Sequence, residues 1–140
     1  MGETSMAMTI KFDEAVGCYF VRWTGTVTAW EYSSYRGIVL ARPWFRKGLN
    51  DIHDTRNAVL EFTRTDVLIE ANSYDMIASA FGDGKGAVLV SGVENTRLLR
   101  TLVGASVKAQ GFIKFFDNYD NARAWVGLPE DYPDPFEDAW

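Results

Sequence analysis

The chain has 140 residues, of which 47% are hydrophobic, and its formal net charge is −5. This size is sufficient for one domain with a buried core. The acidic balance argues against a nucleic-acid partner, because nucleic-acid-binding proteins usually present a basic face, and no apolar run approaches the roughly 20 residues that a transmembrane helix needs.

The first residues and the cysteine count bear on where the protein works. The N-terminal sequence lacks the basic start and the long apolar core of a signal peptide, and Cys18 is the single cysteine, which excludes an internal disulfide. Both features predict a cytoplasmic protein. Because Cys18 stands beside Tyr19 and Phe20, we expect it to be a small buried hydrophobic residue rather than a nucleophile.

Residues 1–8 are predicted to form a loose N-terminal arm, and two strands are predicted after it. Residues 9–14 alternate apolar and polar side chains, which is the pattern of a β-strand. Residues 18–27 are rich in aromatic and β-branched side chains, and residues 15–17 have the composition of a turn. Together these segments predict a β-hairpin.

The first helix is predicted over residues 29–41. Thr28 and Glu31 have the spacing of a capping box, in which the hydroxyl accepts a hydrogen bond from one free backbone N–H and the carboxylate accepts one from another. Pro43 enforces the end of the helix. Gly37 inside the helix weakens it by about 1 kcal/mol relative to alanine.

The region after this helix offers two alternatives for the third strand. Residues 49–54 are unusually polar for a central strand, whereas residues 58–62 are more apolar. A second helix is then predicted over residues 66–81, with Thr63 or Thr65 as its cap.

The stretch 84–128 indicates strand, helix, strand and helix in turn. Residues 87–91 form a short apolar run that suits a strand buried on both faces. A helix follows over residues 96–110, with Gly111 as its C-cap glycine. Residues 112–116 are the next strand, and a last helix runs through Trp125 with Asn118 or Asp120 as its cap.

The last twelve residues, 129–140, hold three of the four prolines and five acids. We expect this segment to be a solvated acidic tail outside the core. The alternative is that Tyr132, Phe136 and Trp140 dock on the body of the domain or on a partner.

The predicted order is a β-hairpin followed by alternating helices and strands. This order favours an α/β fold with a mostly parallel five-stranded sheet, about four helices and right-handed crossovers. We therefore expect one domain over residues 9–128, preceded by the arm and followed by the acidic tail.

Four local patterns resemble the SpoIIAA-like branch of the STAS superfamily, which is also described as STAS/Sec14-like. They are the aromatic and basic lead at residues 44–48, the Asp-Thr-Arg at 54–56, the polar cap at 62–68, and the stretch 87–125 that ends in Ala-x-x-Trp. The resemblance covers about residues 9–128, and it favours residues 49–54 as the third strand.

The resemblance implies a small α/β domain that is commonly a homodimer and has no established catalytic residues. It also implies that such domains hold apolar ligands or touch membranes by opening helices away from the sheet. Better-known STAS relatives are phosphorylated antagonists of anti-sigma factors and carry Asp-Ser-Ser-Gly at the start of the second helix. This chain has Thr63-Arg64-Thr65-Asp66 there instead.

His53 is the single histidine and stands among Asp51, Asp54 and Arg56. A histidine oriented by a carboxylate can act as a general base, but no nucleophile accompanies it in a known motif, and we expect a hydrogen-bonded ring at a strand end. Asp54 and Arg56 would share one face of a strand and form an ion pair. The spacings of metal sites are absent, so no metal or cofactor is predicted.

The glycine-rich run at residues 82–86 is predicted to be a connection and not a phosphate-binding loop. A phosphate-binding loop follows a strand and opens a helix, whereas this run follows a predicted helix and precedes a strand.

Aromatic side chains cluster around the second strand and the first helix, and they indicate either core packing or an apolar pocket between helices and sheet. The candidate ligand-binding residues are Trp30, Tyr35, Leu68, Ile77, Phe81, Leu98, Leu102 and Val103. Three functional hypotheses follow. The first is a non-enzymatic module that binds an apolar small molecule or lipid. The second is a STAS-type regulatory protein with a protein partner, phosphorylated on Thr63 or Thr65. The third is an enzyme that uses His53.

Overall fold

The strands build one sheet in chain order, β1-β2-β3-β4-β5, in the computed structural model, which describes residues 7–137. β1 and β2 are antiparallel, and each later neighbouring pair is parallel. The elements are β1 (Met8–Asp13), β2 (Cys18–Thr28), α1 (Ala29–Leu40), β3 (Asn50–Glu61), α2 (Arg64–Phe81), β4 (Gly86–Leu89), α3 (Val93–Ala105), β5 (Ile113–Phe116) and α4 (Tyr119–Val126). This architecture confirms the predicted α/β class.

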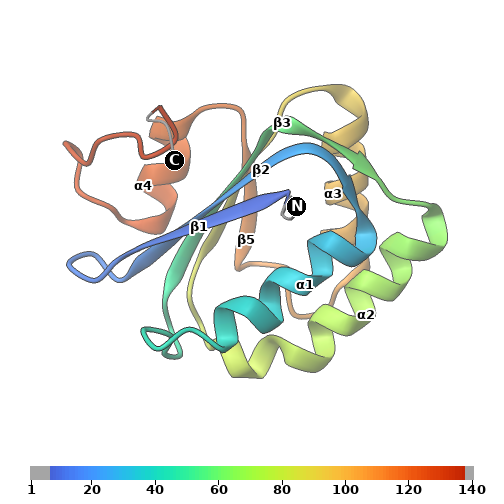
Figure 1. Ribbon diagram of the computed structural model, residues 1–140, viewed down its shortest axis with the longest axis horizontal. Helices are drawn as coiled ribbons and strands as arrows, with labels where there is room; N and C mark the ends of the chain where they lie inside the picture. The colour runs from blue at the N-terminus through green and yellow to red at the C-terminus, as the bar shows by residue number, and fades with distance from the viewer. Residues whose placement is uncertain (1–6, 138–140) are drawn as a thin grey trace, which may run out of the picture.

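Helices cover both faces of the sheet. In Figure 1, α1 and α2 lie below the sheet, while α4 and the C-terminal segment lie on the opposite side. Side chains of β2 alternate between the two faces. Tyr19, Val21 and Trp23 join the hydrophobic cluster under α1, α2 and α3, whereas Cys18 and Phe20 join the cluster under α4. Cys18 is fully buried, as expected, and burial raises the pKa of its thiol.

The third strand contains both of the segments that the sequence offered as alternatives. β3 runs unbroken from Asn50 to Glu61, so the choice of residues 49–54 alone was too narrow. The pairing register between β2 and β3 shifts between Arg22 and Thr24. Because of this shift, His53 faces the helices on one side of the irregularity, whereas Ala58 faces them on the other. One strand therefore carries two alternation patterns of opposite phase.

A predicted cap residue is confirmed at three helices because a cap depends on local hydrogen bonds, although α2 begins at Arg64, two residues before its predicted start. Thr28 and Glu31 form the capping box of α1, and Thr63 forms a capping box with Asp66 at the start of α2. Asn118 caps α4 by accepting a hydrogen bond from the third residue beyond it. Three of the four helix starts are thus fixed by side chains close in sequence.

The prediction of a helix over residues 96–110 was wrong at both ends. α3 begins at Val93 and ends at Ala105, and Ser106 leaves it with extended backbone geometry. Asp75 of α2 accepts hydrogen bonds from the Ser106 hydroxyl at 2.6 Å and from the next two backbone N–H groups. These bonds lower the pKa of Asp75. The Asp75 carboxylate of α2 thus accepts hydrogen bonds from groups just beyond α3, and these groups do not extend the helix.

The C-terminal segment up to residue 137 packs on the sheet, so the expectation of a solvated tail was wrong there. Phe136 is only 7% exposed and meets the Phe20 ring edge-on at 6.1 Å between centroids. The Tyr132 hydroxyl donates to Asp13 Oδ2 at 2.6 Å, and Arg22 donates to the Phe136 carbonyl. Residues 1–6 of the predicted arm and Trp140 of the tail lie outside the described residues.

Candidate functional site

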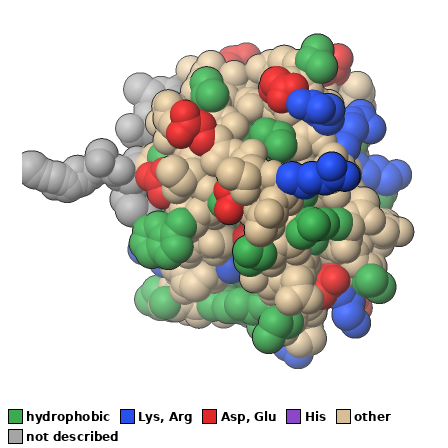
Figure 2. Space-filling view, turned by 90° about the vertical axis from the view of Figure 1, so that its right-hand side faces the viewer, with side chains coloured by type: hydrophobic (Ala, Val, Ile, Leu, Met, Phe, Trp, Pro, Cys, Tyr) green, Lys and Arg blue, Asp and Glu red, His purple; other side chains and the backbone are tan. Residues whose placement is uncertain are grey.

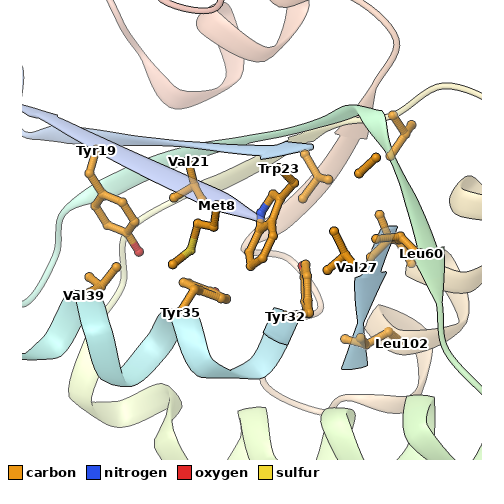
Figure 3. Close-up of a cluster of buried hydrophobic side chains, with 14 of the residues drawn as sticks. Met8, Tyr19, Val21, Trp23, Val27, Tyr32, Tyr35, Val39, Leu60 and Leu102 are labelled. Atoms are coloured by element: carbon orange, nitrogen blue, oxygen red, sulfur yellow. The ribbon is translucent and has the colours of Figure 1, made fainter. Parts of the chain in front are cut away.

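A cavity of about 60 Å³ lies between the sheet and helices α1, α2 and α3. Its polar wall includes Tyr19, Tyr32, Tyr35, Arg36, Asp51, His53 and Tyr74. Its apolar wall includes Leu49, Phe81, Leu99, Leu102, Val103, Ile113 and Phe115. Figure 3 shows part of this region, where Tyr19 and Trp23 extend from β2 toward α1. The hydrogen-bonding side chains thus come mostly from β2, β3 and α1, and the apolar side chains mostly from α3 and β5.

His53 is buried in the polar wall with both ring nitrogens engaged. Its exposed fraction is 3%. Trp23 Nε1 donates a hydrogen bond to His53 Nδ1 at 3.1 Å, and an indole N–H is a donor only. His53 Nδ1 therefore carries no proton, and the ring is neutral with its proton on Nε2, which donates to Asp51 Oδ2 at 2.8 Å. This ring lacks the free, solvent-reachable nitrogen that the general-base hypothesis requires.

Four tyrosine side chains surround the same space. Burial raises the pKa of the Tyr19 hydroxyl, and the charge of the neighbouring Asp51 adds to the rise. Burial likewise raises the pKa values of Tyr32 and Tyr35, and that of Tyr74 to about 12. Within residues 7–137, the hydroxyls of Tyr32, Tyr35 and Tyr74 have no hydrogen-bond partner. The cavity thus presents unused donors and acceptors.

A buried ion pair joins the two helices over the cavity. Arg36 Nη2 of α1 and Glu70 Oε2 of α2 are 2.5 Å apart, and both side chains are almost completely buried. The Arg36 guanidinium also lies 5.6 Å from the Tyr35 ring centroid and 5.7 Å from that of Tyr74. Burial raises the pKa of Glu70, although Arg36 opposes the rise. At this contact, α2 therefore places the Glu70 carboxylate, rather than an apolar side chain, against α1.

The glycine-rich connection between α2 and β4 closes one end of the cavity. Gly82, Gly84 and Gly86 all line it. A Cβ atom at Gly84 would come within 2.0 Å of the Leu49 carbonyl oxygen, and one at Gly86 within 2.9 Å of Asp51 Oδ1. These glycines permit close packing against the start of β3, so the run is a connection, as predicted, but a tightly packed one.

The structure brings together half of the predicted ligand-binding residues. Tyr35, Phe81, Leu102 and Val103 line the cavity, whereas Trp30, Leu68, Ile77 and Leu98 do not. Trp30 is 78% exposed and Leu68 is 55% exposed. Figure 2 shows the face at the right of Figure 1, where exposed apolar side chains stand as separate groups among polar ones.

From α1, the sequence predicted Trp30 and Tyr35 as ligand-binding residues and missed Tyr32 and Arg36. The helix buries Tyr32, Tyr35, Arg36 and Val39. The spacing i, i+3, i+4, i+7 of this buried set is the signal that would have found it. The arginine within the set obscured the pattern.

The predicted polar cluster of His53, Asp54 and Arg56 does not exist as one group. It lies inside β3, not at its end, and successive side chains point to opposite faces. His53 contacts Asp51 and Trp23 on the helical side. Asp54 instead pairs with Arg56 at 2.9 Å, as predicted for that pair.

The two candidate phosphate acceptors differ in their surroundings. The Thr63 hydroxyl accepts a hydrogen bond from the Asp66 N–H at 3.0 Å as part of the cap. Thr65 is exposed in the first turn of α2.

Within residues 7–137, no group of three or more histidine, cysteine or acidic side chains has an arrangement suited to a metal ion. No helix in the same range combines the length and apolar character required to cross a bilayer.

Comparisons with known proteins support the fold. No family model matches the chain, and no curated protein matches it. Among solved structures, it is similar to an uncharacterised protein of the DUF3478 family with a SpoIIAA-like fold from Shewanella loihica PV-4. The sequences are 13% identical, the match covers 90% of this chain and 98% of that protein, and the TM-score is 0.57. The chain therefore has a SpoIIAA-like fold, which confirms the sequence resemblance at that level.

Proposed function

We propose that this protein is a non-enzymatic binding module that holds a small molecule with an apolar body between the sheet and helices α2 and α3. The observation that carries the proposal is the cavity with one apolar and one hydrogen-bonding wall. Such a combination is typical of small-molecule sites, where apolar area supplies affinity and a few polar groups fix orientation.

The size of the cavity implies that a ligand of more than a few carbons must displace a helix. One water needs about 10–15 Å³ of such space, so about 60 Å³ accommodates only a few waters. α2 is the helix suited to move. It packs mainly on α3 and α1, and its side chains Leu68, Ile69 and Met76 are exposed. Each ligand CH₂ buried behind it would contribute about 0.8 kcal/mol.

Native mass spectrometry of protein purified from its own host is the first test. We expect a co-purified small molecule that is released on denaturation. Val103→Phe, which places a ring in the cavity, should abolish binding of the small molecule. Val107→Phe adds the same ring at an exposed position and is the control. Leu102→Glu should also abolish binding. Full occupancy in folded Val103→Phe and Leu102→Glu proteins would contradict the proposal.

A regulatory protein-protein interaction is the second candidate. The observation in its favour is the exposed Thr65 in the first turn of α2, where the helix dipole favours a phosphate group. Phosphopeptide mapping of protein from cells tests it. Modification of neither Thr63 nor Thr65 would count against this candidate.

A further inference from the structure

The charges that line the cavity do not balance. Arg36 and Asp51 are the charged lining residues within the described chain. Arg36 is already neutralised by Glu70. Within residues 7–137, His53 is the one basic side chain at ion-pair distance from Asp51, and the hydrogen bond from Trp23 keeps that ring neutral. One negative charge, on a side chain that is 17% exposed, is thus left without a cation, and a partly buried charge without a counter-ion is costly.

Two tyrosines of α1 lie next to the His53–Asp51 pair. The Tyr35 ring centroid is 4.7 Å from that of His53 and 5.9 Å from that of Tyr32. Tyr32 and Tyr35 are each more than nine-tenths buried, and their hydroxyls have no hydrogen-bond partner within residues 7–137. Asp51 is among the charges that raise the pKa values of both hydroxyls, although burial is the larger cause. A neutral phenol can accept a hydrogen bond from a cationic N–H, and its ring face attracts a cation.

We propose that the ligand carries a protonated amine at its polar end, placed beside Asp51 and the Tyr32 and Tyr35 hydroxyls, with its apolar body toward Leu102. This inference rests on the proposed binding function and specifies its ligand class. The ammonium group neutralises the unbalanced carboxylate and donates to the unpartnered hydroxyls. The aliphatic side chains of α3 then cover the carbon chain.

Other polar ends fit this geometry less well. A carboxylate or phosphate would be repelled by Asp51 and would have to displace Glu70 from Arg36. An alcohol would hydrogen-bond with the tyrosines but would leave the charge of Asp51 unbalanced. The polar wall therefore selects by charge, and it disfavours anions by repulsion as well as favouring cations by attraction.

Three probes of equal length test this selection: n-hexylamine, 1-hexanol and hexanoate, each titrated into the full chain by calorimetry at neutral pH. We expect hexylamine to bind about tenfold tighter than hexanol, and hexanoate to bind weakest. Asp51→Asn keeps an acceptor for His53 Nε2 but removes the charge, so it should bring the amine and alcohol affinities close together. Glu61→Gln removes an exposed charge from the same strand and should leave their ratio unchanged.

A second variant separates binding from folding. Tyr35→Phe removes a hydroxyl without a partner, so it should weaken hexylamine binding several-fold and leave the melting temperature unchanged or higher. Hexanol or hexanoate binding as tightly as hexylamine would overturn the amine assignment and leave the binding function standing. Binding of none of the three probes would overturn both proposals.

Discussion

Trp23 and His53 join neighbouring strands through a hydrogen bond of 3.1 Å from the indole Nε1 to the imidazole Nδ1. The bond lies where the β2–β3 register shifts, and it fixes the tautomer of the ring that contacts Asp51. One buried indole therefore stands at the irregularity of the two strands and fixes which nitrogen of His53 carries the proton in the polar wall.

We predict that nitrogen NMR will find His53 with its proton on Nε2 at neutral pH. Trp23→Phe removes the donor to Nδ1, so the unfolding free energy should fall by about 1–3 kcal/mol. Trp30→Phe, at a position that is 78% exposed, is the matched control and should change it by less than about 0.5 kcal/mol. A proton on Nδ1 in the native protein would disprove the assignment.

The buried Glu70 should make stability depend on pH. Its pKa is raised in the folded chain, so the folded state binds this proton more readily than the unfolded chain does. The resulting stabilisation is complete below the ordinary glutamate pKa and is lost as pH rises through the raised value. We therefore expect the unfolding free energy of the native protein, measured relative to Glu70→Gln, to decrease as pH rises through this window. A constant or increasing difference would show that the carboxylate is not destabilised by burial.

Two glycine substitutions should act in opposite directions. A Cβ atom at Gly37, inside α1, would meet open space, so Gly37→Ala should stabilise the protein by up to about 1 kcal/mol. A Cβ atom at Gly84 would lie 2.0 Å from the Leu49 carbonyl oxygen, so Gly84→Ala should cost about 1–3 kcal/mol. Denaturant unfolding measures both. Equal effects of the two changes would contradict the close approach at Gly84.

The docked C-terminal segment should contribute to global stability. Phe136→Ala removes a buried ring from the cluster under α4, and we expect a loss of about 1.5–3 kcal/mol. Glu137→Ala, at the exposed neighbouring position, serves as its control. If the segment were solvated, both changes would leave the unfolding midpoint unaltered.

The two threonines at the start of α2 should also differ. Thr63→Ala removes the cap and should cost about 1 kcal/mol, whereas Thr65→Ala should have little effect at an exposed site. Thermal unfolding of the two variants provides the comparison. A larger loss for Thr65→Ala would mean that the cap lies elsewhere.

The amino-acid sequence by itself determined the order of the elements, the fold class and the cap at Thr28. It also narrowed the caps of α2 and α4 to two residues each, from which the structure selects Thr63 and Asn118. These features depend on the spacing of apolar residues and on hydrogen bonds between residues two to four positions apart. Both can be recognised in the amino-acid sequence. Burial of Cys18 and the Asp54–Arg56 pair were predictable for the same reason.

The tertiary structure decided what depends on contacts between distant segments. The register shift beside Trp23 reverses the alternation of inward and outward side chains within β3. One continuous alternating pattern therefore does not run through the strand, and the sequence could not identify it as a single element. The Asp75 carboxylate of α2 accepts hydrogen bonds at the end of α3, and Phe136 packs on Phe20 on the face of the sheet that α4 covers. The polar wall likewise forms where side chains of β2, α1, β3 and α2 meet, and the Arg36–Glu70 ion pair joins two residues that lie far apart in the sequence.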